Sequence, residues 1–106
     1  MSSLHIYAFI LETIRLFRPV VDAIEKRDRS LADQLRRALA SMALNCGEGA
    51  GNRRGNRRLR FETVCGSAKE SRCAYETADA LGYVALDPAR VDRLDRIAAT
   101  TWKLSR

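Results

Sequence analysis

Long apolar segments are absent from this sequence, and so is a targeting segment. The longest apolar runs, such as residues 6–11, are far shorter than the roughly 20 residues that a membrane-spanning helix requires. Residues 1–5 show no basic leader before a long apolar stretch, which is the pattern of a secretory signal. A chain without either feature is expected to be a soluble protein of the cytoplasm, with no membrane partner.

Residue types that support catalysis or metal binding are also scarce. The only histidine is His5, and there is no Glu-x-x-His pair of the kind found in di-metal helical bundles. The glycines do not form the phosphate-binding pattern G-x-x-x-x-G-K-S/T. Neither Ser67 nor Cys73 has an accompanying histidine to act as its base. We therefore expect no catalytic residue, no metal ion and no cofactor, and predict that the protein is not an enzyme.

Paired cysteines are missing too. The three cysteines, Cys46, Cys65 and Cys73, are odd in number and have no C-x-x-C spacing. This pattern argues against a disulfide framework or a metal site. Because free cysteines in helices are commonly buried, we expect all three to be buried, reduced thiols.

The sequence does contain a repeated helical pattern. Apolar residues recur three and four positions apart in four segments, as in helices with one apolar face. The segments cover residues 4–26, 30–48, 56–81 and 88–105, and no strand pattern is found. A chain of 106 residues fits one domain. We predict an all-α fold in which residues 1–106 form a single antiparallel up-down four-helix bundle.

Local signals mark the helix ends. Asp28 or Ser30 can cap the second helix. Asp87 followed by Pro88 is a strong start for the fourth helix, because proline is favoured at the first helical position. Gly82 fits the end of the third helix.

Two interruptions are also expected. Pro19 lies inside the first apolar stripe, where proline is expected to kink or divide a helix. Closely spaced glycines predict a break between the second and third helices. These glycines are Gly47, Gly49, Gly51 and Gly55.

The positive charge of the chain is concentrated in one short segment. Residues 51–60 contain no acid and account for +5 of the net charge of +6. Cations at the start of a helix oppose its dipole by about 0.3–1 kcal/mol each, whereas phosphate groups are favoured there. Because no aromatic residue is interleaved with the arginines, base stacking is not expected. We predict phosphate-backbone contacts to RNA or DNA by Arg53, Arg54, Arg57, Arg58 and Arg60.

Two functions fit this arginine segment. The leading interpretation is a non-catalytic accessory protein that binds nucleic acid through the junction between its second and third helices, with steep salt dependence. The alternative is a protein-interaction scaffold whose arginine patch docks on an acidic protein surface. A solvated charge run that improves solubility is the plainest reading of the same residues.

We assign structural roles to three other polar residues. They lie either near the glycine-rich corner, which is the segment 47–55 between the second and third helices, or along the third helix. Asn45 and Glu48 are three positions apart. They are expected to satisfy the loosened backbone at the glycine-rich corner or to pair with an arginine. Glu70 is the third such residue.

Several groups of residues together resemble a known family. They are Gln34-Leu35-Arg36-Arg37-Ala38, Asn45-x-x-Glu48-Gly49-x-Gly51, and Arg60-Phe61 followed by Gly66-Ser67-x-x-Glu70. In order and spacing they are similar to the bacterial "four helix bundle protein" family, over about residues 5–105. That family includes proteins encoded by intervening sequences in large-subunit ribosomal RNA genes. It also includes the accessory variability protein of diversity-generating retroelements.

The resemblance implies a four-helix protomer that assembles into a ring-shaped homopentamer with a basic surface. For the retroelement branch it implies nucleic acid and a reverse transcriptase as partners. A chain this short buries a limited share of its surface, which also favours oligomerisation. The sequence departs from the family pattern before the Arg-Phe pair, where Arg54 and Arg57 replace a Ser or Thr cap and an acid. Asn52 or Asn56 is left to cap the third helix.

Overall fold

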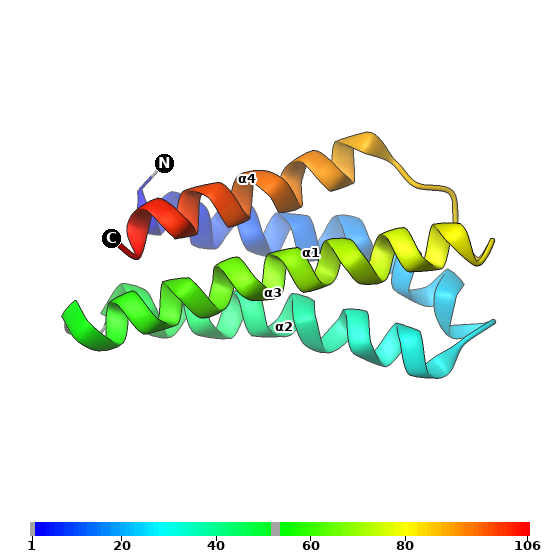
Figure 1. The fold of residues 1–106 in the computed structure, drawn as a ribbon, viewed down its shortest axis with the longest axis horizontal. Helices are drawn as coiled ribbons and strands as arrows, with labels where there is room; N and C mark the ends of the chain where they lie inside the picture. Colours follow the sequence, from blue (N-terminus) through cyan, green and yellow to red (C-terminus); the bar gives the residue numbers. More distant parts are fainter. Residues whose placement is uncertain (1, 52–53) are drawn as a thin grey trace.

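Four α-helices make up most of the chain in a computed structural model that describes residues 2–51 and 54–106. The helices are α1 (Ser3–Glu25), α2 (Arg29–Gly51), α3 (Arg54–Ala80) and α4 (Pro88–Leu104). This part of the chain contains no strand, which confirms the all-α prediction. The helices lie side by side, and α1 and α3 each pack against both α2 and α4 (Figure 1). Both termini, the end of α2 and the start of α3 lie at one end of the molecule, which we call the junction end.

The core is formed by the apolar stripes of all four helices. Phe17 of α1 and Tyr75 of α3 are fully buried and meet edge to face, with ring centroids 5.0 Å apart. Burial of each large apolar side chain contributes roughly 1.5–3 kcal/mol, so these stripes hold the helices together. In α4 the buried residues are Leu94, Ile97 and Thr101, and Ala98 lies at the edge of the core.

The starts of α2 and α4 follow the predicted capping signals. The Asp28 carboxylate accepts a hydrogen bond of 3.0 Å from the Leu31 backbone N–H at the start of α2. At the start of α4 the Asp87 carboxylate accepts one of 2.9 Å from the Ala89 N–H, with Pro88 as the first helical residue. Each cap satisfies a backbone donor that has no partner within its helix.

The end of α3 is set by Gly82. Its φ angle is +80°, a left-handed conformation that glycine adopts without steric cost. The Gly82 N–H donates to the Asp79 carbonyl and the Tyr83 N–H donates to the Ala78 carbonyl, both at 2.9 Å. This paired pattern is a Schellman motif, and it confirms the predicted stop.

Pro19 does not divide the first helix, because α1 is continuous from Ser3 to Glu25. The proline ring lies on the exposed side of the helix. A proline disturbs the carbonyl groups of the preceding turn. One of these, the Leu16 carbonyl, accepts a hydrogen bond of 2.8 Å from Arg90 Nε of α4. The neighbouring helix therefore supplies a donor to the carbonyl next to that of Arg15, which is the one that loses its helical donor at Pro19.

The predicted glycine break between the second and third helices is wrong in its position. The helix predicted at 30–48 continues to Gly51, and the one predicted at 56–81 begins at Arg54. Each helical glycine costs about 1 kcal/mol relative to alanine, but tertiary contacts hold this segment. A Cβ on Gly47 would lie 3.4 Å from the Tyr7 ring of α1, and one on Gly49 would lie 3.6 Å from the Phe61 ring of α3.

Two of the three cysteines are buried as predicted. Cys46 and Cys65 are free, buried thiols. Cys73 is free but exposed, so the expectation that all three are buried is wrong for this residue. Its position on α3 lies outside the apolar stripe, on the side of the helix that borders α4.

Candidate functional site

The start of α3 is joined to the end of α4 through Arg57. Its Nη1 donates to the Leu104 carbonyl at 3.4 Å, and its guanidinium lies over the Phe61 ring, 5.0 Å from the centroid. A basic side chain is favoured at a helix C-terminus, where backbone carbonyls lack partners. This contact brings the C-terminal cations Lys103 and Arg106 to the same end of the molecule as the arginine segment.

Arg60 is tied to α2 by two interactions. Its Nη1 donates to Asn45 Oδ1 at 3.0 Å, and its Nη2 forms an ion pair of 2.7 Å with Glu48 Oε2. The Asn45 amide is itself fixed, since its Nδ2 donates to the Ser41 carbonyl at 2.9 Å and lies 3.1 Å from Ser41 Oγ. Of the two roles predicted for Asn45 and Glu48, pairing with an arginine is the one that the structure contains.

Gly49 allows this close approach of α2 and α3. A Cβ at Gly49 would lie only 3.1 Å from Arg60 Cβ, which is tighter than ordinary van der Waals contact. A larger residue there would push α3 away from α2 and lengthen the Arg60 contacts.

Serines continue the polar contact along the α2–α3 interface. Ser41 Oγ and Ser67 Oγ share a hydrogen bond of 2.8 Å, and Ser71 Oγ donates to the Ser67 carbonyl at 2.8 Å. Ser67 and Ser71 are buried, and their hydroxyls are paired as buried polar groups should be. Glu70 lies exposed on the outer side of α3, with no ion pair among the described residues. The residues Asn45, Glu48, Gly49, Arg60 and Ser67 therefore form one inter-helix contact.

Arg58 is the most exposed of the three predicted arginines whose side chains are described. Its side chain is 70% exposed and forms an ion pair of 3.1 Å with Glu62, four residues later on α3. An exposed pair of this kind contributes only about 0.3–0.5 kcal/mol, so Arg58 can exchange this partner for another anion. Of the other two predicted arginines, Arg54 is the first residue of α3, and Arg53 lies outside the described residues.

Positive charge therefore exceeds negative charge at the junction end. Among its described side chains there are two acids, Glu48 and Glu62, so the local balance is +3. The cations are Arg57, Arg58, Arg60, Lys103 and Arg106. Lys103 and Arg106 were not predicted as part of the site. They are more than forty residues from the arginine segment, and only the packing of α4 against α3 brings them together.

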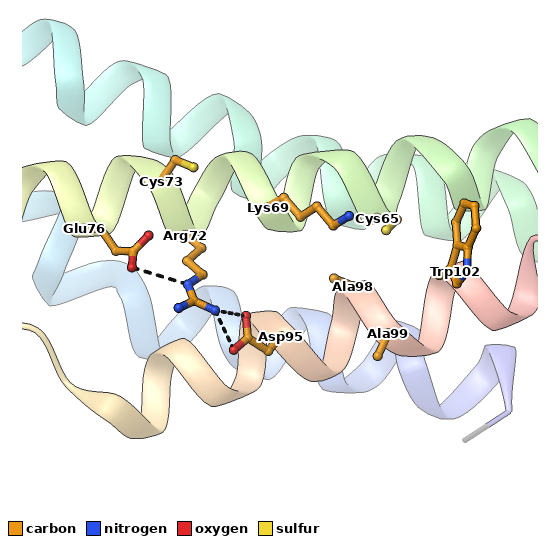
Figure 2. A pocket seen from close by; sticks show the side chains of 9 residues that line it. All are labelled: Cys65, Lys69, Arg72, Cys73, Glu76, Asp95, Ala98, Ala99 and Trp102. Carbon is orange, nitrogen blue, oxygen red and sulfur yellow. Dashed lines mark hydrogen bonds and ion pairs between the residues drawn. The ribbon is translucent and has the colours of Figure 1, made fainter.

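A groove of about 640 Å³ runs between α3 and α4. Figure 2 shows Arg72 of α3 reaching across it to Asp95 of α4, and Trp102 standing at its other end. The hydrogen bonds from Arg72 to Asp95, both 2.8 Å, raise the pKa of Arg72 above its ordinary value. Trp102 is 46% exposed.

The fold and this site define a small all-helical protein with a polar contact between α2 and α3 and a basic end. Comparison with protein-family models, curated proteins and solved structures finds no match to this chain. Within residues 2–51 and 54–106, no group of three or more His, Cys, Asp or Glu side chains is placed to hold a metal ion. Of the helices in the same ranges, none has the length and apolar character needed to cross a membrane.

Proposed function

We propose that this protein is a non-catalytic accessory protein that binds the phosphate backbone of RNA or DNA through its junction end. The observation that carries the proposal is the contact between Arg57 and Leu104. It places cations from the start of α3 and the end of α4 on one surface. Clustered Lys and Arg side chains on one face are the electrostatic footprint of nucleic-acid binding.

The local electrostatics of α3 support the same proposal. The first turn of α3 contains arginine and no acid, although the helix dipole favours acids there. The structure offers Glu62 as a partner for Arg58 and Glu48 as a partner for Arg60, which leaves an excess of cations. A polyanion would compensate this excess, because backbone amides at a helix start and guanidinium groups both bind phosphate.

The test is the salt dependence of binding, measured by fluorescence anisotropy with labelled RNA and DNA at micromolar protein. Arg58→Gln is expected to weaken binding across sequences and to reduce the slope of log K against log salt by about 1. Arg36→Gln is the matched control. Arg36 is also an exposed, paired arginine, but it lies near the start of α2, away from the junction end.

Binding that is insensitive to salt, or an equal loss in both variants, would contradict the proposed surface. A partner that is retained after nuclease treatment and lost in Arg58→Glu would instead favour an acidic protein surface. In that case a reverse transcriptase, the partner implied by the family resemblance, is the first protein to test.

We further propose that the chain forms a ring-shaped homo-oligomer, a pentamer by the family resemblance. Leu44 of α2 and Leu59 of α3 support this, since they are 67% and 61% exposed. A ring would repeat the junction end and add avidity to weak phosphate contacts. Light scattering is expected to give a multiple of 11.9 kDa. A monomer mass at all concentrations would reject the assembly and leave the nucleic-acid proposal standing.

A further inference from the structure

The groove between α3 and α4 has a floor of small side chains. Cys65 on α3 and Ala98 and Ala99 on α4 line it, and they leave the space of about 640 Å³ open. Pockets that bind small organic groups have volumes of about 300–1,000 Å³ and mainly apolar linings with a few polar groups. The α3–α4 groove therefore has the size and lining to hold a planar organic group.

The two ends of the groove differ in charge. At one end Arg72 is neutralised by Asp95 at 2.8 Å and by Glu76 at 3.5 Å. Lys69 has no carboxylate within ion-pair distance among the described residues. Figure 2 shows its side chain extending along α3 toward Cys65, in the direction of Trp102. The available positive charge is thus at the Trp102 end.

Trp102 supplies a flat aromatic surface at this end. It lies in the last turn of α4, two residues before Leu104, whose carbonyl accepts from Arg57. The Arg106 guanidinium lies over one face of the indole ring, 4.4 Å from its centroid. The side chain is still 46% exposed. The groove therefore opens onto the cationic junction end through an exposed aromatic ring.

We propose that the α3–α4 groove binds an unpaired base of single-stranded nucleic acid, with the base stacked on Trp102 and the flanking phosphates bound by Lys69 and Arg106. The inference rests on the proposed nucleic-acid function and specifies that the surface prefers single strands to duplexes. Aromatic stacking combined with a positively charged groove is the usual means of binding single strands without sequence preference.

This occupant uses the features of the groove together. The bases of a duplex are paired and stacked on one another, so they cannot enter without being extruded. An acidic peptide would pair with Lys69 and Arg106 but would not require a stacking surface. A base needs both the aromatic face and the adjacent cations.

Trp102 is the only tryptophan of the chain, so its fluorescence reports directly on the groove. The experiment titrates the intact protein with oligodeoxythymidylate and with an abasic strand of the same length. The intact strand is expected to quench the tryptophan emission, because a base stacks on the indole. The abasic strand is expected to bind through its phosphates with little quenching.

Variants separate stacking from charge in anisotropy titrations with labelled strands. Trp102→Ala is expected to weaken binding of the intact strand about 5- to 150-fold. This range corresponds to the free energy of stacking one base on an aromatic side chain. The abasic strand should be unaffected. Leu81→Ala is the matched control, because Leu81 is also a large apolar residue, 54% exposed, at the opposite end of α3. Lys69→Gln should weaken both strands and reduce the salt slope by about 0.7.

The outcomes are distinguishable. If the intact strand binds without quenching and Trp102→Ala binds like the wild type, the groove inference fails and the proposed function stands. If neither strand binds, both fail. Equal quenching by poly-glutamate would also overturn the inference in favour of an acidic protein partner. If circular dichroism shows that Trp102→Ala does not fold, the groove inference is tested by the wild type alone. The test is then whether the intact strand quenches the tryptophan emission more than the abasic strand does.

Discussion

Two glycines of the α2–α3 pair have opposite surroundings. A Cβ on Gly49 would lie 3.1 Å from Arg60 Cβ, whereas one on Gly66 would meet no atom within 4 Å. Both residues are inside helices, where alanine is favoured over glycine by about 0.5–1 kcal/mol. The same substitution should therefore change stability in opposite directions at the two positions.

Gly66→Ala is expected to raise the free energy of unfolding by about 0.5–1 kcal/mol, because only the helix propensity changes. Gly49→Ala is expected to lower it by about 1 kcal/mol, since overpacking costs about 1–3 kcal/mol and exceeds the gain in propensity. Urea unfolding followed by circular dichroism measures both values. A stabilising Gly49→Ala would show that α2 and α3 can separate without loss.

The three thiols should react at very different rates. Burial raises the pKa of Cys46 to about 11, so this thiol stays protonated and unreactive near neutral pH. Cys65 is also buried, and Cys73 is exposed. A thiol reagent is expected to label Cys73 alone in the native protein and all three cysteines after unfolding. Mass spectrometry of the labelled peptides checks this, and labelling of Cys46 in the native state would contradict its burial.

At the scale of the elements, arginine side chains of α4 connect this helix to α1. Arg93 of α4 has a side chain that is only 17% exposed, with its guanidinium 3.9 Å from the centroid of the Phe9 ring. It also donates to Thr13 Oγ1 at 2.9 Å and to the Phe9 carbonyl at 3.3 Å. Arg96 lies over the same ring at 5.0 Å and is exposed.

Arg93→Ala is expected to lower the free energy of unfolding by about 2 kcal/mol, because it removes charged hydrogen bonds and a close cation–π contact. Arg96→Ala removes the same charge from the same helix and should change stability by less than about 0.5 kcal/mol. Chemical denaturation of the two variants makes the comparison. Equal losses would mean that net charge, rather than the Arg93 contacts, determines the effect.

The element boundaries were predictable where a single local interaction sets them. The caps at Asp28 and Asp87 and the stop at Gly82 depend on residues within a few positions of each other. The end of α2 was not predictable in this way. The Tyr7 and Phe61 rings, which belong to other helices, lie against Gly47 and Gly49, and a local sequence pattern does not reveal such neighbours.

The same distinction applies to the candidate site. The clustering of arginines in residues 51–60 is visible in the sequence, but their partners are not. Arg60 contacts Asn45 and Glu48, and Arg57 contacts Leu104, across 12 to 47 positions of the chain. The sequence around Trp102 does not show that this residue shares a groove with Lys69. That arrangement depends on the register between α3 and α4. The family resemblance remains a prediction.

At the scale of the whole molecule, the fold places cations of separate segments together. Because α2 and α4 end near the start of α3, the net charge of +6 is not spread evenly over the surface. Like charges held together in this way lower the stability of the compact state through repulsion. Anything that neutralises the junction end should therefore stabilise the folded protein.

Inorganic polyphosphate is expected to raise the Tm at low salt, because a ligand that binds only the native state adds RT ln(1 + [L]/Kd) to its stability. At a concentration of about 100 times Kd the gain is about 2.7 kcal/mol, or on the order of 10 °C for a domain of this size. The shift should vanish as salt shortens the Debye length to about 3 Å near 1 M. The control is spermine, a polycation that should give no increase. If the Tm shift persists in high salt, polyphosphate binds through contacts other than the exposed cations of the junction end, which contradicts the prediction.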